Sequence, residues 1–233
     1  MGRLAIVTAT QRELRAAVPG APRIPHAEPV AWRWRGMDFY MVCCGMGPVN
    51  AAFGMGRLFQ HAPELRGVLN LGTAGSFRPQ ELPLGQSVVV REEIWPEFGL
   101  RTGGGVDPAG LKSGQGILAG ETVRDRLELN PRRSLFSLGV SRSLPWPEAR
   151  SLTVAGASAD PHQAEWYAQR YSPDVENMEG FALAWPCLKY GVPFAEVRCI
   201  SNVVGSRHRR DWDASGALAQ LGTVMTVLLE RMD

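Results

Sequence analysis

Short apolar runs separated by helix-like segments are the feature that most constrains this chain. The runs lack the strict polar–apolar alternation of a strand with one wet face, which indicates strands buried on both faces. They are Leu4–Val7, Phe39–Cys44, Gly67–Leu71, Ser87–Ile94, Ser151–Ala157 and Phe194–Ile200. Helical periodicity marks Gln11–Val18, Val49–His61, Phe181–Lys189 and Ala214–Met232. Strands alternating with helices predict an α/β layered fold with a largely parallel sheet.

Residues 99–147 break this pattern. Gly103–Gly105 and the prolines at 108, 131, 145 and 147 indicate loops, and we expect one helix near Glu121–Leu129. The segment is predicted to be an excursion from the sheet. Because α/β domains of 200–250 residues are common, the 233 residues with 45% hydrophobic content predict one domain over residues 1–233.

Charge and hydropathy exclude several classes of partner. The formal net charge is +2, which provides no large field for nucleic acid or anionic lipid. No apolar run approaches the ~20 residues of a membrane span, and the opening Leu4–Val7 is too short for a signal peptide. Four cysteines without CxxC spacing argue against a disulfide or zinc framework: Cys43, Cys44, Cys187 and Cys199. We expect a cytoplasmic protein with reduced cysteines and no metal.

The turn Gly45–Gly47 follows a predicted strand and precedes a predicted helix, as a dinucleotide fingerprint would. The fingerprint is incomplete, because Asn50 stands at the third glycine position and Glu64 precedes the next strand instead of ending it. The alternative interpretation is a tight turn that needs glycine torsions.

Other chemistry-bearing residues are predicted beyond the carboxyl ends of strands, where ligands bind in open α/β sheets. Gly72–Gly75 is predicted to form a small-residue loop that would let a flat ligand or a phosphate approach backbone amides, and a plain turn is the alternative. Glu13 and Glu179 each begin a predicted helix. Two carboxylates at this edge suit a reaction that builds positive charge on a sugar. The helix dipole would also favour either acid without any catalytic role.

Together these residues carry a family resemblance. Glu13, Asn70–Gly75, Val175–Gly180 and Val197–Asn202 resemble the nucleoside phosphorylase and nucleosidase superfamily, and within it the chain looks most like the futalosine hydrolases of menaquinone biosynthesis. The resemblance implies a three-layer αβα sandwich around a mixed, partly barrelled sheet. It also implies hydrolysis of an N-ribosyl bond without metal or organic cofactor, a nucleoside substrate, and a homo-oligomer, dimer or larger, whose neighbouring subunit lines the 5′ pocket.

The same resemblance implies residue roles. Glu13 would orient and activate the attacking water, Glu179 would bind the ribose hydroxyls, and Met178 would lie against the sugar. The remaining expected substrate contacts are Thr73, Ala74, Gly75, Asn177, Ser201 and Asn202, with Arg198 in support. A carboxylate on the ribose hydroxyls would stabilise oxocarbenium charge more in the transition state than in the ground state.

Asn202 bears on the choice of base. Related nucleosidases that act on adenine nucleosides carry Asp at this position, whereas Asn presents an NH₂ donor. Because a 6-oxopurine offers two acceptors on that edge, the amide predicts hypoxanthine or guanine. A strand-end cap is the alternative role for Asn202.

The 5′ benzoate of futalosine would suit an arginine. The candidates are Arg207, Arg209 and Arg210, with Trp95, Phe98, Trp166 and Trp212 as possible stacking partners. A solvated loop is an equally good interpretation of the arginine cluster. His162 and Gln163 are expected in a loop that approaches the base or lies at the surface.

Three other functions stay open. A purine nucleoside phosphorylase would need a phosphate clamp, to which Arg12 and Arg91 could contribute. A methylthioadenosine or aminofutalosine nucleosidase is disfavoured by Asn202. A catalytically silent nucleoside-binding protein is disfavoured by the presence of both Glu13 and Glu179.

Overall fold

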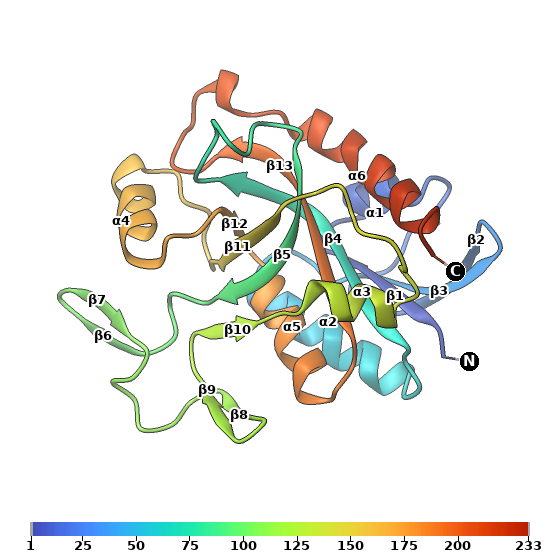
Figure 1. Ribbon diagram of the computed structural model, residues 1–233, viewed down its shortest axis with the longest axis horizontal. Helices are drawn as coiled ribbons and strands as arrows, with labels where there is room; N and C mark the ends of the chain where they lie inside the picture. The colour runs from blue at the N-terminus through green and yellow to red at the C-terminus, as the bar shows by residue number, and fades with distance from the viewer. Residues whose placement is uncertain (1, 233) are drawn as a thin grey trace.

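The computed structural model describes residues 2–232 and places a nine-stranded sheet at its centre (Figure 1). The strand order is β10-β5-β11-β12-β4-β1-β3-β2, and β13 pairs with both β4 and β5. The strands are β1 (Leu4–Thr8), β2 (Val30–Trp34), β3 (Met37–Cys43), β4 (Gly67–Ser76), β5 (Ser87–Ile94), β10 (Arg126–Glu128), β11 (Glu148–Thr153), β12 (Val175–Asn177) and β13 (Phe194–Val203). Pairing runs in a closed circuit through β4, β13, β5, β11 and β12, so this part of the sheet is a small barrel.

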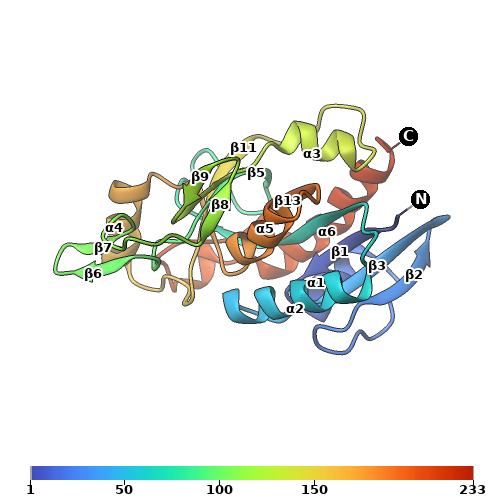
Figure 2. The same cartoon turned by 90° about the horizontal axis from the view of Figure 1, so that it is seen from below.

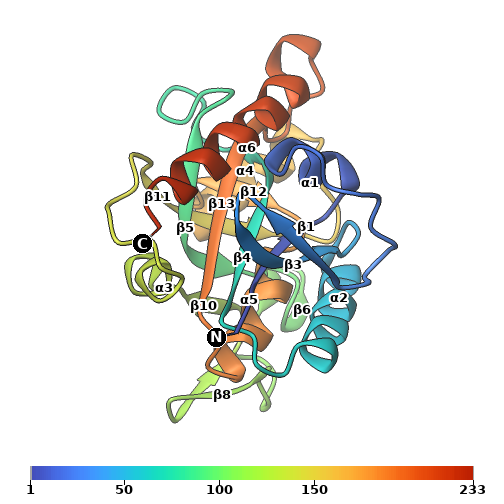
Figure 3. The ribbon, with the colours of Figure 1, turned by 90° about the vertical axis from the view of Figure 1, so that its right-hand side faces the viewer.

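Helices cover both faces of the sheet. On one face α1 (Gln11–Ala17) and α6 (Ala214–Leu229) pack over β1, β3, β4 and β13. On the other face α2 (Pro48–His61) and α5 (Gly180–Lys189) pack together, as the end view shows (Figure 3). Two further helices, α3 (Pro131–Ser137) and α4 (Pro161–Tyr171), and a 3₁₀ turn at Arg209–Asp211 lie outside these pairs. The predicted three-layer αβα sandwich is confirmed.

The sheet is less parallel than the sequence predicts. Among the residues described, five of the nine strand pairings within this sheet are parallel and four are antiparallel. One antiparallel pair arises from β2, which the sequence analysis did not identify. Its half-buried Val30, Trp32 and Trp34 alternate with exposed residues, so it is an edge strand with one wet face.

Residues 99–147 hold no helix at Glu121–Leu129, and that prediction is wrong. The segment forms the hairpins β6 (Leu100–Thr102) with β7 (Gly105–Asp107) and β8 (Gly116–Leu118) with β9 (Glu121–Val123), which Figure 2 shows from below. β10 and α3 follow (Figure 1). Ala119 and Gly120 both have positive φ, which closes the two-residue β8–β9 loop. The helix starts later, at Pro131, where Asn130 caps it through the amide of Arg133.

Two strands extend further than predicted. β4 continues to Ser76 and β13 to Val203, so Thr73–Gly75 and Ser201–Asn202 lie within paired strands instead of in loops after them. The pairing of β13 with β4 shifts register between Ile200 and Asn202. A β-bulge of this kind bends a strand and re-aims its side chains. These extended strands carry most of the residues expected at the site.

Candidate active site

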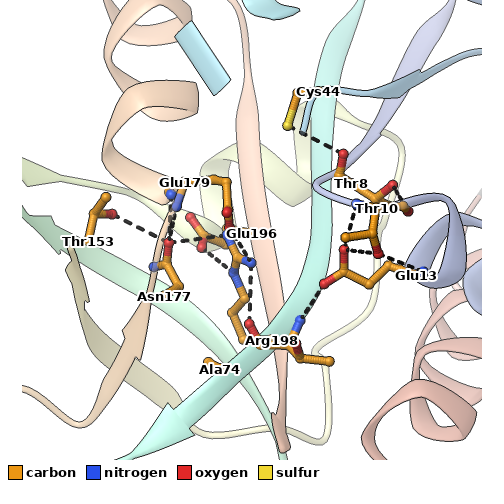
Figure 4. Close-up of polar contacts among 12 residues, drawn as sticks. Thr8, Thr10, Glu13, Cys44, Ala74, Thr153, Asn177, Glu179, Glu196 and Arg198 are labelled. Carbon is orange, nitrogen blue, oxygen red and sulfur yellow. Dashed lines mark hydrogen bonds and ion pairs between the residues drawn. The ribbon is translucent and has the colours of Figure 1, made fainter. Parts of the chain in front are cut away.

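Glu13 is buried in the first turn of α1 (Figure 4). Its Oε2 accepts hydrogen bonds of 2.8 Å from both the amide and the hydroxyl of Thr10, and the Thr10 hydroxyl accepts from the Glu13 amide. This reciprocal pair is a capping box, so Glu13 does stabilise the start of the helix. The other oxygen, Oε1, accepts from the amide of Thr73 at 3.2 Å, which ties Glu13 to β4.

Glu179 lies at the N-terminal end of α5 and is 5% exposed. Its Oε1 accepts a 2.9 Å hydrogen bond from the amide of Gly47, and its Oε2 lies 3.6 Å from Nη1 of Arg198. Burial raises the pKa of Glu179, while Arg198 and the Gly47 amide oppose that rise and Glu13 adds to it. The carboxylate is therefore held at the meeting point of two helix N-termini.

The turn before α2 holds Glu179 in this way. Gly45 and Gly47 have φ of 93° and 87°, which confirms the glycine-turn interpretation. Gly47 precedes Pro48 at the start of the helix, where amides have no partner within the helix. Sequence reasoning missed the Gly47 amide as a partner of Glu179. The only sequence signal was a glycine directly before a helix-starting proline.

Glu13 and Glu179 approach one another around Gly72. A Cβ at Gly72 would collide with Nη1 of Arg198 and would lie 3.2 Å from Oε1 of Glu13. The same Nη1 donates to the carbonyl of Thr73 at 3.4 Å and faces Glu179. The structure thus brings both predicted carboxylates and Arg198 to one region, and Gly72 is required because no side chain fits between them.

Asn202 lies further along the same two strands. Gly72 pairs with Arg198 and Gly75 pairs with Asn202, so Asn202 lies roughly 10 Å from Gly72 along β4, at about 3.3 Å per residue. The Ser201 hydroxyl lies 2.9 Å from Asn202 Oδ1 and 3.3 Å from the carbonyl of Ala74, and can donate to either. The Asn202 amino group lies against Gly75 and donates to the Val203 carbonyl at 3.4 Å.

Asn177 is buried and its side chain is fully engaged within the protein. Its Oδ1 accepts bonds of 2.7 Å from the amides of Glu179 and Gly180, which caps α5. Its Nδ2 donates to Glu93 at 2.8 Å and to Ser151 at 2.5 Å. These bonds fix the backbone of Glu179. The sequence analysis expected Asn177 to contact the substrate. We propose instead that Asn177 positions Glu179.

The remaining expected residues differ in their surroundings. Thr73 and Met178 are half-buried, and Met178 packs with the aromatic side chains of α4. Ala74 and Gly75 are buried in β4. His162 and Gln163 lie in the first turn of α4 and are exposed, so the prediction that they form a loop is wrong.

The arginine cluster after Asn202 is exposed. Arg207 lies over the ring of Trp212 with 5.3 Å between the guanidinium carbon and the ring centroid. The Trp212 indole donates to the carbonyl of Ser206, and Trp212 pairs with Asn202 in a β-bridge. Arg209 and Arg210 belong to the 3₁₀ turn. Of the three arginines, Arg207 is therefore joined most directly to Asn202.

The other aromatic and basic candidates lie elsewhere. Trp95 packs against Phe98 and Phe181, and Trp166 packs against Tyr167 and Tyr171. Arg12 is exposed, and Arg91 lines a small cavity with Glu128 and Glu148. Neither arginine makes a described contact with Glu13 or Glu179.

A larger apolar cavity of about 780 Å³ opens between α2 and α5. Pro48, next to Gly47, forms one part of its wall, and Trp95, Thr153 and Phe181 form another. Exposed Val49 and Tyr190 lie at its lining. The cavity therefore adjoins the Gly47 turn without containing Glu13, Glu179 or Asn202.

Residues 2–232 contain neither a candidate membrane-spanning helix nor a candidate metal-binding cluster. No helix there is both long enough and apolar enough to cross a membrane. No group of three His, Cys, Asp or Glu side chains there is arranged to hold a metal ion. All four cysteines are buried free thiols.

The fold is an αβα sandwich with a small barrel. Its site combines two buried glutamates at helix N-termini with an amide on β13. Together these features define the class of nucleoside-cleaving α/β proteins. The chain belongs to the phosphorylase superfamily, whose family model matches residues 3–231. It is 33% identical to a futalosine hydrolase of Thermus thermophilus over 86% of this chain and 85% of that protein. It is 26% identical to a 5′-methylthioadenosine/S-adenosylhomocysteine nucleosidase of Geobacillus kaustophilus over 87% and 85%.

Solved structures share the fold. A futalosine hydrolase mutant of Helicobacter pylori superposes with a TM-score of 0.77 at 16% identity and covers 100% of both chains. A 5′-methylthioadenosine-bound nucleosidase mutant from the same organism gives a TM-score of 0.77 at 15% identity, also over 100% of both. The predicted family resemblance and fold class are therefore confirmed.

Proposed function

We propose that this protein hydrolyses the N-ribosyl bond of futalosine to hypoxanthine and dehypoxanthine futalosine in menaquinone biosynthesis. The observation that carries the proposal is the convergence of Glu13, Glu179 and Arg198 around Gly72, with Asn202 further along the same strands. The identity to the Thermus thermophilus futalosine hydrolase supports the choice of substrate.

Glu179 would bind the ribose hydroxyls. As the bond to the base breaks, positive charge develops on the ribose, and a nearby carboxylate stabilises it more in the transition state than in the substrate. The Gly47 amide and Arg198 favour the ionised form that this role requires. Because Arg198 lies at 3.6 Å, it does not pair closely with the carboxylate.

Glu13 would hold and activate the attacking water. Its Oε2 is occupied by two donors from Thr10, whereas Oε1 has one partner, the Thr73 amide. A carboxylate oxygen has further lone-pair capacity, so Oε1 is the atom available to accept from a water. Fixing that water opposite the departing base would add a contribution from orientation to its activation.

Asn202 would select the base. When the Ser201 hydroxyl donates to Asn202 Oδ1 and one N–H of the amide donates to the Val203 carbonyl, the second N–H would be the donor available to the base. That donor matches O6 and N7 of a 6-oxopurine, whereas the 6-amino group of adenine would oppose it. Leaving one buried polar group unpaired costs about 1–3 kcal/mol, which is enough to favour hypoxanthine over adenine.

The 5′ benzoate would be bound by Arg207 and Trp212. Trp212 is bridged to Asn202, and the exposed Arg207 guanidinium lies over its ring. A guanidinium on an aromatic face can donate charge-assisted hydrogen bonds to the benzoate carboxylate while the benzoate ring stacks on the indole. Met178 and Thr73 would contact the ribose.

We further propose a homo-oligomer in the cytoplasm, with residues 1–233 as one domain. The apolar cavity between α2 and α5 and the exposed Val49 and Tyr190 support an interface there. The four free thiols are what a reducing compartment maintains.

A second candidate is an adenine-type nucleosidase, favoured by the Geobacillus kaustophilus relative. One experiment separates the candidates: the protein is incubated with futalosine, inosine, aminofutalosine and methylthioadenosine, with and without phosphate. We expect hypoxanthine from futalosine without phosphate. A strict phosphate requirement would instead identify a phosphorylase, adenine release would identify the second candidate, and tight binding without turnover would identify a binding protein.

A further inference from the structure

A cluster of buried polar groups lies behind Glu179, and the mechanism above does not use all of it. Glu93 on β5 and Glu196 on β13 are both 0% exposed, and Arg198 is 1% exposed. Gly180, at the start of α5, separates the two carboxyl groups. A Cβ there would collide with Oε1 of Glu93 and would lie 2.8 Å from Oε1 of Glu196. Gly180 therefore makes room for two acids that reach the same point in the protein.

The two acids have different partners. Glu196 Oε1 accepts from Nε of Arg198 at 2.7 Å, and its Oε2 has no partner among the described residues. Glu93 accepts only from neutral groups in the described part of the chain: Thr153 at 2.5 Å and Asn177 at 2.8 Å. An ionised carboxylate without a close cation is costly to bury, whereas a neutral acid is not.

The charges of the cluster also indicate that Glu93 is the neutral acid. Within residues 2–232, the ion pairs of this cluster are those of Arg198 with Glu196 and with Glu179. One guanidinium cannot balance three buried carboxylates, so at least one acid carries a proton. Glu93 is that acid, because it is the one without an ion pair.

Resting on the function proposed above, we propose that Glu93 and Glu196 are positioning residues. Glu93 is a neutral acid beside Glu196, and the ionised Glu196 holds the Arg198 guanidinium so that Glu179 keeps most of its negative charge for the ribose. Two connections lead to Glu179. Nε of Arg198 donates to Glu196 at 2.7 Å, whereas Nη1 of Arg198 lies 3.6 Å from the Glu179 carboxylate. Asn177 donates to Glu93 and accepts from the amide of Glu179.

Burial raises the pKa of Glu93 well above that of an ordinary glutamate, and the nearby Glu196 raises it further. The groups that face Glu93 are Glu196 and Arg198 from β13, Asn177 from β12, Ser151 and Thr153 from β11, and Gly180 from α5. Of these only Arg198 would lower the pKa through charge, and its closest anion is Glu196.

Infrared spectroscopy tests the proton directly. At neutral pH, the difference spectrum of wild type minus Glu93→Gln should contain the carbonyl stretch of a protonated carboxylic acid. Wild type minus Glu92→Gln should not, because Glu92 is a buried neighbour on β5 that is ion-paired with Arg126 and Arg150. If Glu93→Gln removes no such band, the proposal is wrong. This measurement does not depend on futalosine being the substrate.

Kinetics test the effect on Glu179. In Glu196→Gln the guanidinium loses its closest anion and turns to Glu179, so we expect kcat to fall by about ten- to a hundredfold. The acidic limb of its pH–rate profile should move to lower pH, since a closer cation favours the ionised form.

Controls separate this effect from damage to the fold. Glu196→Asp should recover part of the loss because it keeps the anion, and Glu92→Gln should keep the wild-type kcat and acidic limb even where its melting temperature falls. A folded Glu196→Gln protein with the wild-type acidic limb would overturn the proposal. Absence of activity in the wild type would refute the proposed function and leave the infrared result to decide the proton.

Discussion

Glu179 is subject to opposing influences that determine its charge. Burial favours the neutral form, and the Gly47 amide and Arg198 favour the ionised form. Glu13, the second carboxylate of the site, again favours the neutral form. Because these influences oppose one another, the Glu179 carboxylate can stabilise positive charge on a bound ribose with little rearrangement of the groups around it.

Replacing this carboxylate tests its role in catalysis. We expect Glu179→Ala to lower kcat on futalosine by about 10²- to 10³-fold, the usual effect of removing one group that stabilises transition-state charge. The fold should persist, because the lost group is a buried carboxylate whose pKa burial raises. Steady-state kinetics and a thermal melt measure the two effects. A variant with wild-type kcat would show that Glu179 does not contact the reacting sugar.

Asn202 offers a test of base selection. In Asn202→Asp, a protonated carboxylic acid can donate to N7 while its carbonyl oxygen accepts from a 6-amino group. The NH₂ of Asn is a donor and cannot accept from that amino group. We expect the ratio of kcat/KM for hypoxanthine nucleosides to that for adenine nucleosides to fall by about ten- to a hundredfold. Competition assays with paired nucleosides measure the ratio. An unchanged ratio would contradict the role of Asn202.

Side-chain chemistry made some site residues predictable, and others could not be predicted. Glu13 and Glu179 were identifiable because both are acids expected at helix starts beyond the carboxyl ends of strands, where ligands bind in open α/β sheets. The Gly47 amide was not, because a backbone donor has no signature in residue type and lies 132 positions from its acceptor. Glu93 and Glu196 were likewise assigned only to strands, since their pairing depends on strand neighbours.

At the level of elements, the N-termini of α2 and α5 converge on Glu179. Gly47 precedes α2 and donates to the carboxylate, while Glu179 itself begins α5, whose first amides bond Asn177. Free amides at helix N-termini favour an anion. The turn before α2 therefore supports the ionised form of Glu179 through the Gly47 amide, whereas the first amides of α5 are occupied by Asn177 and fix the backbone of Glu179.

The turn before α2 provides a test of this arrangement. Gly47→Ala meets no atom within 4 Å, but its φ of 87° strains an alanine by about 1–2 kcal/mol. Relief of that strain moves the amide away from Glu179, so we expect kcat/KM to fall by about tenfold. Gly36→Ala is the matched control, with φ of 82° and open space in the β2–β3 turn. It should lose similar stability and keep activity; equal activity losses would refute the idea.

Element boundaries were predictable where local chemistry decides them. α2 and α5 were expected within one residue of their observed starts, because Pro48 and Gly180 mark them. The helix expected at Glu121–Leu129 failed because a two-residue hairpin at Ala119 and Gly120 was not recognised. The ends of β4 and β13 were missed because small residues that resemble a loop are paired there with a neighbouring strand.

For the whole molecule, the arrangement of layers leaves an apolar surface uncovered beside α2. Val49 on α2 is 82% exposed beside the cavity of about 780 Å³. We expect Val49→Arg to weaken self-association, because a charge in an apolar interface is costly to desolvate. Phe136→Arg on α3, exposed at a different surface, is the control and should keep the wild-type mass. Sedimentation measures both. A wild-type monomer would contradict the interface.

The stability of the whole molecule should respond to pH through two neighbouring residues with opposite signs. The pKa of Glu93 is raised by burial and by Glu196. Glu93 therefore binds its proton more tightly in the folded protein than in the unfolded chain. Its contribution to the free energy of unfolding is full below about pH 4.3 and is lost as pH rises through the folded-state pKa. Burial also raises the pKa of Glu92, but Arg150 and Arg126 outweigh it, so the net pKa is lowered. That contribution is present above about pH 4.3 and is lost as pH falls through the folded pKa.

Glutamine has no proton to lose, so each variant removes one of these dependences. As pH rises from acid to neutral, we expect the melting temperature of Glu93→Gln to improve relative to wild type, while that of Glu92→Gln worsens. Thermal melts of the three proteins across this range measure both trends. Because the residues are adjacent on β5 and both buried, a general effect of removing a glutamate would move both variants in the same direction. Parallel trends would therefore contradict the neutral Glu93, and diverging trends follow only if the two acids differ in charge.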